Sequence, residues 1–143
     1  MGKVYDAIDE KLSAWLSAQK IFFVATAPLS EQGHVNCSPK DSRSFQILDE
    51  RTVVYLDLTG SGVETIAHVK ENGRIVLMFC AFSGAPNIVR MHGRGEVIES
   101  HHRDFLTLKA RFGIGLIPKN WTVEKCSSAQ VKGAEGNEEK SVQ

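Results

Sequence analysis

Residues 52–82, TVVYLDLTGSGVETIAHVKENGRIVLMFCAF, decide the fold class, because strand and helix patterns follow one another there without a break. The run 52–58 is short and rich in β-branched residues, which is typical of a strand. The glycine-spaced residues 59–62 form a loop that opens a helix over 63–72. Asn72 and Gly73 end that helix, since both residue types tolerate the left-handed conformation. The apolar run 75–82 predicts the next strand.

Further strands are expected on both sides of this segment. Upstream, residues 21–27 predict a buried strand, and 34–38 predict a second strand. Pro39 donates no ladder hydrogen bond, so that second strand should end there or lie at a sheet edge. Downstream, 87–98 predict a long strand in which Gly93 and Gly95 mark a bulge, a bend or a close backbone approach. The sixth expected strand is 121–126, and apolar spacing predicts helices over 6–19 and 101–112.

Six closely spaced strands with hairpin-length links favour an antiparallel barrel over a parallel sheet with crossover helices. We therefore expect a mainly β domain with flanking helices, of the α+β class. It should extend over residues 1–126, with 1–20 as an N-terminal helix. Residues 127–143 are nearly free of apolar side chains, which predicts a disordered polar tail.

The composition restricts the class of protein. The chain has 143 residues, of which 42% are hydrophobic and 24% charged, as in a single globular domain. Lys plus Arg and Asp plus Glu both number 17, so no general attraction to nucleic acid is expected. The three cysteines form no Cys-x-x-Cys pair, which argues against a disulfide framework or a thiolate zinc site. With no signal-peptide core and no apolar run long enough to span a membrane, we expect a cytoplasmic protein.

The loop at 59–62 is the most suggestive local feature. Its backbone N–H groups and the following helix start could hold an anion such as a phosphate. The alternative is a capping box formed by Ser61 and Glu64, which explains both residues without a ligand. Lys40 and Arg90 are isolated cations at strand positions, and each could be either a solvated charge or an anion ligand. No histidine has the spacing of a metal site, and the catalytic residues remain unknown from sequence.

Three segments carry a resemblance to a known family. They are the strand–loop–helix–strand segment at 54–82, GHVNCSPK at 33–40 and RMHGRG at 90–95. Together they resemble the pyridoxamine 5'-phosphate oxidase-related family over about residues 21–98. The resemblance implies a split β-barrel that forms a homodimer and binds FMN in a cleft at the subunit interface.

The same resemblance, carried over position by position, assigns a cofactor site. Residues 35–40 match the cofactor-binding strand, 58–59 match the pair that contacts the flavin, and 61–65 match the phosphate-binding helix start. The residues so expected to bind FMN are Asn36, Ser38, Lys40, Leu58, Thr59, Gly60, Ser61, Gly62, Thr65 and Arg90. Val35, Glu64 and Thr65 stand where the oxidase has cations, which predicts weaker phosphate binding. Lys40, Arg90 or Arg43 could compensate.

The function implied by the resemblance is an FMN-dependent oxidoreductase that acts on an unknown small molecule. Oxidation of pyridoxamine phosphate is not expected, because 101–112 lacks the Tyr, Arg and Ser set that holds that substrate in the oxidase. One alternative is a non-catalytic split-barrel dimer that has lost its phosphate clamp. Another is a barrel that binds a deazaflavin or haem, for which His68 and His92 are the candidate axial ligands.

Overall fold

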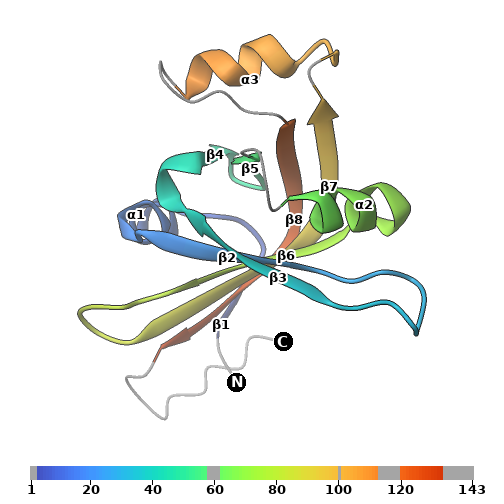
Figure 1. Ribbon diagram of the computed structural model, residues 1–143. Coiled ribbons are helices and arrows are strands. Elements are labelled where there is room, and N and C mark those ends of the chain that lie inside the picture. The colour runs from blue at the N-terminus through green and yellow to red at the C-terminus, as the bar shows by residue number, and fades with distance from the viewer. Residues whose placement is uncertain (1–2, 58–61, 100, 113–119, 134–143) are drawn as a thin grey trace.

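The computed structural model describes residues 3–57, 62–99, 101–112 and 120–133 (Figure 1). The strands are β1 Lys3–Tyr5, β2 Ile21–Thr26, β3 Asn36–Asp41, β4 Phe45–Asp49, β5 Thr52–Asp57, β6 Arg74–Cys80, β7 Asn87–Glu99 and β8 Asn120–Gly133. The helices are α1 Glu10–Ala18, α2 Val63–Asn72 and α3 Phe105–Arg111, with a 3-10 turn η1 at Ser42–Ser44. The strands form one antiparallel sheet in the order β3-β2-β6-β7-β8-β5-β4, and β1 pairs with β8.

The sheet is rolled into a barrel, because side chains from distant strands meet in one core. Phe22 on β2 and Phe45 on β4 have ring centroids 5.5 Å apart, although β6, β7, β8 and β5 separate their strands in the sheet order. Phe79 on β6 stacks on Phe22 with a centroid distance of 5.1 Å, and the Tyr55 ring packs edge-on at 5.9 Å. All four aromatic residues are buried. The mainly β antiparallel barrel expected from the sequence is thereby confirmed.

The C-terminal end of helix α2 is bound to the sheet by two side-chain hydrogen bonds. Lys70 Nζ lies 2.7 Å from Glu99 Oε1 on β7, and this hydrogen bond holds the pKa of Glu99 below its ordinary value. Asn72 Nδ2 donates to the carbonyl of Ala27, just beyond β2, at 2.8 Å. Gly73 follows with a φ of 71°, which ends the helix as the sequence predicts. The helix therefore has a fixed position over β2 and β7.

Gly95 on β7 lets α2 pack directly on the sheet, which confirms the expected close backbone approach. A Cβ at this position would lie 3.2 Å from Val69 Cγ1 and 3.3 Å from Ile75 Cγ2. We expect Gly95→Ala to lower the free energy of unfolding by about 1–3 kcal/mol through overpacking, measured by chemical denaturation. Adding Val69→Ala removes the methyl groups that the new Cβ would meet. The free energy of unfolding of the double variant should therefore fall by less than the sum of the decreases in the two single variants. Strict additivity would contradict this role for Gly95.

Two local expectations about β3 and β7 are confirmed. β3 ends the strand order and pairs with β2 through a register that includes Pro39, so the proline lies in an edge strand, as its missing N–H requires. The pairing of β7 with β8 shifts between His92 and Gly93, so the ladder is irregular at the glycines, and the extra residue, Ser127, lies on β8.

Three boundaries differ from expectation. Helix α1 begins at Glu10 rather than at residue 6, because the Asp9 carboxylate caps it by accepting the N–H of Leu12 at 2.7 Å. Residues 3–5, which lie within the N-terminal helix expected over 1–20, instead form β1. Helix α3 comprises residues 105–111 and is shorter than the expected 101–112. None of the described helices is long and apolar enough to cross a membrane.

The expected polar tail at 127–143 is wrong in its first part. Residues 127–133 continue β8, and they pair with β7 on one side and β1 on the other. Backbone pairing on both sides therefore outweighs the low apolar content of this segment. With β1 and β4 added, the described part of the chain contains eight strands rather than six. The remainder of the expected tail, 134–143, lies outside the described residues.

Candidate functional site

A row of polar side chains lies on the inward face of the edge strand β3. Asn36, Ser38 and Lys40 are opposite Thr26, Val24 and Phe22 of β2 in the strand register. Because side chains alternate across a strand, these three residues share the face that carries the buried Val24 and Phe22. The structure thus brings three of the expected cofactor-binding residues together on one side of the sheet.

Two hydrogen bonds connect helix α2 to the sheet here, one from the row on β3 and one from the neighbouring strand β2. Asn36 Nδ2 donates to Thr65 Oγ1 at 2.9 Å, and Thr65 is fully buried in the first turn of the helix. One turn further along, Thr26 Oγ1 and His68 Nδ1 share a hydrogen bond of 2.9 Å. The expected site residue Thr65 is therefore beside Asn36, although 29 residues separate them in sequence. The role of Thr26 and His68 in fixing α2 was missed by sequence reasoning, since they lie 42 residues apart without a motif that links them.

Ser38 stands at the centre of the row and has an unsatisfied hydroxyl group. The residue is 8% exposed, and its Oγ is buried without a hydrogen-bond partner among the described residues. A buried hydroxyl that forms no hydrogen bond carries a desolvation penalty. Such a group is retained at low cost when a ligand supplies the missing bond, so Ser38 marks the row as a candidate binding surface.

Lys40 and the start of α2 define the ends of this surface. Lys40 Nζ lies 5.8 Å from the centroid of the Tyr55 ring, within the range of a cation–π contact. The N-cap of α2 is Gly62, which has no side chain to accept the first helical N–H groups. Ser61, the expected partner in the alternative capping box, lies outside the described residues. Glu64 occupies the first turn as an exposed carboxylate.

The remaining expected residues are not part of this arrangement. Arg90 is opposite Met78, which is opposite Phe23, so Arg90 lies on the outward face of the sheet, away from Ser38. Arg43, which could have compensated for missing cations, is bound by Asp41 through Nε and Nη2 at 3.1 and 2.8 Å. This pairing lowers the pKa of the Asp41 carboxyl from its ordinary value. Leu58, Thr59, Gly60 and Ser61 lie outside the described residues.

The outward face contains a separate hollow between β2, β6 and β7. It has a volume of about 230 Å³, and Ala25, Val35, Val76, Arg74 and His92 contribute to its lining. Its walls are mainly apolar, with Arg74 and His92 as cationic or ionisable groups. The hollow contains no member of the inward row, so the chain has two distinct surfaces on opposite faces of one sheet.

No group of three or more His, Cys, Asp or Glu side chains suited to a metal ion occurs within the described ranges. His68 is occupied by its hydrogen bond to Thr26, and His92 lies on the opposite face from the Asn36, Ser38 and Lys40 row. The two histidines considered as axial ligands therefore do not face one common space.

The chain belongs to the pyridoxamine 5'-phosphate oxidase family, whose model matches residues 8–115. A curated relative, the pyridoxamine 5'-phosphate oxidase family protein ustO of Aspergillus flavus, is 40% identical over 112 residues. That alignment covers 77% of this chain but only 45% of the relative, so the chain spans less than half of that relative's length. The family expected from the sequence motifs is confirmed.

Solved structures with low sequence identity have the same fold. HupZ of Group A Streptococcus is 20% identical, with a TM-score of 0.69 and coverage of 90% of this chain and 95% of that chain. An FMN-binding protein from Syntrophomonas wolfei is 16% identical, with a TM-score of 0.66 and coverage of 89% and 86%. A putative pyridoxamine 5'-phosphate oxidase from Lactobacillus delbrueckii is 20% identical, with a TM-score of 0.58 and coverage of 90% and 93%. These similarities identify the fold as the split barrel.

Proposed function

We propose that this protein binds a flavin, FMN in the first instance, and acts as a flavin-dependent oxidoreductase on a small molecule other than pyridoxamine phosphate. The observation that carries the proposal is the buried Ser38 hydroxyl, which lacks a partner among the described residues between Asn36 and Lys40. Family membership and the structural similarity to a protein described as FMN-binding support it.

The inward row fits the polar chain of a flavin. Ser38 Oγ would bond a ribityl hydroxyl, and the Asn36–Thr65 pair would present an amide oxygen and a hydroxyl proton beside it. The uncapped backbone N–H groups that follow Gly62 would face the distal end of the chain. Lys40, held over Tyr55, would supply a positive charge. When bound, the flavin supplies the hydride or electron transfer, and the protein supplies position and electrostatics.

A direct test is to titrate the flavin-free protein with FMN. The quenching of flavin fluorescence on binding is the measured signal. We expect saturable binding with one flavin per chain, and flavin absorption in the protein as purified. Reduction of the bound flavin by a nicotinamide cofactor, without turnover of added pyridoxamine phosphate, would support the oxidoreductase assignment. Failure to bind FMN would contradict the proposal and favour a non-catalytic barrel.

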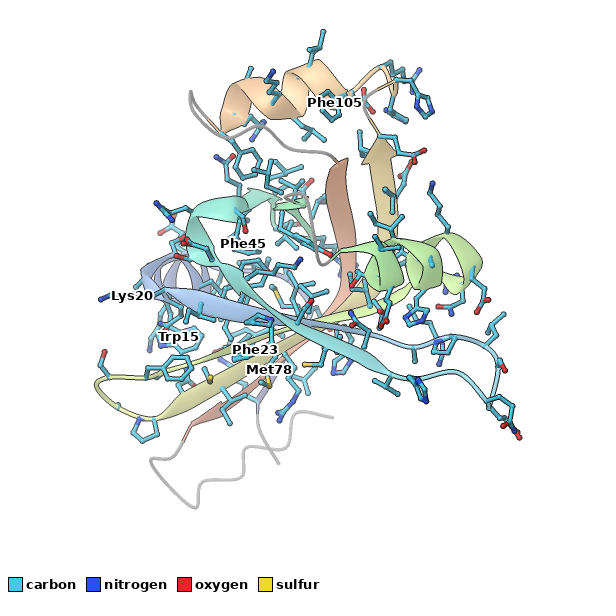
Figure 2. All side chains as sticks on the ribbon, in the orientation of Figure 1. Trp15, Lys20, Phe23, Phe45, Met78 and Phe105 are labelled. Carbon is cyan, nitrogen blue, oxygen red and sulfur yellow. The ribbon has the colours of Figure 1, made fainter. Side chains whose placement is uncertain are left out.

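We further propose that two copies of the chain associate through the outward face of the sheet, which is the face opposite the flavin-binding row and so differs from the shared interface cleft that the resemblance implies. This face presents apolar side chains from β2 and β6, and Phe23 is directly opposite Met78 in the register. Figure 2 shows Phe23 and Met78 on this side of the sheet, away from Phe45 in the core. Nearby Ile21 and Phe82 are 40% and 70% exposed. Contiguous exposed apolar residues of this kind are typical of an interface.

The variant Phe23→Lys tests this interface. A lysine at the centre of an apolar contact leaves a charge to be desolvated, so we expect the variant to be monomeric at concentrations where the parent protein has twice the mass of 15.8 kDa. Light scattering distinguishes the two states. The matched control is Leu106→Lys on α3, an equally apolar residue that is 73% exposed, and it should leave the mass unchanged. A monomeric parent protein would contradict the interface.

We also propose a cytoplasmic location, a reducing compartment. Among the described residues Cys37 is an exposed free thiol and Cys80 is a second free thiol, and free thiols of this kind persist in a reducing environment.

A further inference from the structure

The charges around the inward row do not match a phosphate dianion. Of the cations considered for this role, Arg43 is bound by Asp41, and Arg90 lies on the opposite face of the sheet. Lys40 remains on the inward face. Glu64 places a carboxylate in the first turn of α2, close to the helix end where an anion would bind. One positive and one negative side chain nearly cancel, so the described residues offer little net attraction for a phosphate.

Apart from Lys40, the groups that the inward row and Thr65 offer are neutral. Ser38 contributes a buried hydroxyl, and Thr65 and Asn36 contribute a second hydroxyl and an amide. Hydroxyl and amide groups both donate and accept hydrogen bonds, which matches the hydroxyl groups of a ribityl chain. Charge-assisted bonds, the stronger kind that selects phosphates, are absent from this set.

We infer that the flavin is recognised by its ring system and ribityl hydroxyls, and that its terminal phosphate contributes little, so the protein binds riboflavin about as well as FMN. This inference rests on the proposed flavin-binding function and goes beyond it by naming the ligand class, a flavin with or without its phosphate. The neutral chemistry of Ser38, Asn36 and Thr65 and the carboxylate of Glu64 carry it.

The test compares FMN and riboflavin as ligands of the full flavin-free chain, by fluorescence quenching at low and high salt. We expect the two dissociation constants to agree within about tenfold and the FMN constant to change little with salt. FMN binding more than about tenfold tighter than riboflavin would overturn the inference while leaving the proposed function intact. If neither flavin binds, the proposed function fails as well. The two failures are therefore distinguishable.

A charge-reversal variant gives a second readout. Glu64 is exposed, so Glu64→Lys should fold normally while replacing the carboxylate beside the helix start by a cation. We expect FMN affinity to rise about tenfold or more and riboflavin affinity to change less than about twofold. The matched control is Glu10→Lys, which makes the same change in the first turn of α1, on a different side of the barrel from α2 (Figure 1). Glu10→Lys should alter neither affinity. Equal gains for both flavins in Glu64→Lys would contradict the inference.

Discussion

Phe22→Ala should lower the free energy of unfolding by about 3–5 kcal/mol, the largest stability effect that we expect in this chain. Phe22 is fully buried, and its ring lies 5.1 Å from Phe79, 5.5 Å from Phe45 and 5.9 Å from Tyr55, measured between centroids. Truncation removes these ring contacts and leaves a cavity beside aromatic residues of β4, β5 and β6. Because β4 and β2 meet through this ring, its loss weakens the closure of the barrel as well as the local packing.

Chemical denaturation at one fixed protein concentration measures this effect, since an oligomer would make stability concentration-dependent. The matched control is Leu106→Ala, which truncates an apolar side chain that is 73% exposed and lies outside the proposed interface. We expect the control to change stability by no more than about 0.5 kcal/mol. Similar losses in the two variants would mean that Phe22 does not hold the barrel closed.

The parts of the fold that sequence predicted have strong local signals. Helix α2 was predicted over its full length, because the glycine-spaced loop precedes it and Asn72-Gly73 ends it. The irregular pairing of β7 was predicted from Gly93 and Gly95 inside the expected strand, and the register with β8 shifts at Gly93. By contrast, β1 and residues 127–133 have weak local patterns. They form strands because each pairs with a segment far away in the chain, and pairing partners are not visible in a single sequence.

In the candidate site, too, the features with local sequence signals were predictable and the long-range contacts were not. Asn36, Ser38 and Lys40 alternate along one strand, so the sequence motif that contains them also places them on one face. The contacts that decide their chemistry were not predictable. Asn36 meets Thr65 across 29 residues, and whether Arg43 turns to Asp41 or to a ligand depends on local geometry. Arg90 was assigned by family motif alone, and the strand register places it on the other face.

Ser38→Ala should affect stability and flavin binding in opposite directions. The Ser38 hydroxyl is buried without a hydrogen-bond partner in the described part of the chain, so its removal relieves a desolvation penalty. We expect the flavin-free variant to gain about 1 kcal/mol in free energy of unfolding. The same change deletes the hydroxyl that would bond the ribityl chain, and we expect flavin affinity to fall about tenfold.

Thermal melts of the flavin-free and flavin-saturated protein separate the two effects. The melting temperature without flavin should rise in Ser38→Ala, and the further increase on adding flavin should shrink relative to the parent protein. Ser83→Ala, in the exposed turn between β6 and β7, is the matched control and should change neither quantity. A structural role for Ser38 predicts the reverse, a lower melting temperature without flavin and an unchanged flavin affinity. Opposite signs in the two measurements are expected only if the hydroxyl is kept for a ligand, because a group that served folding alone would not be destabilising in the empty protein.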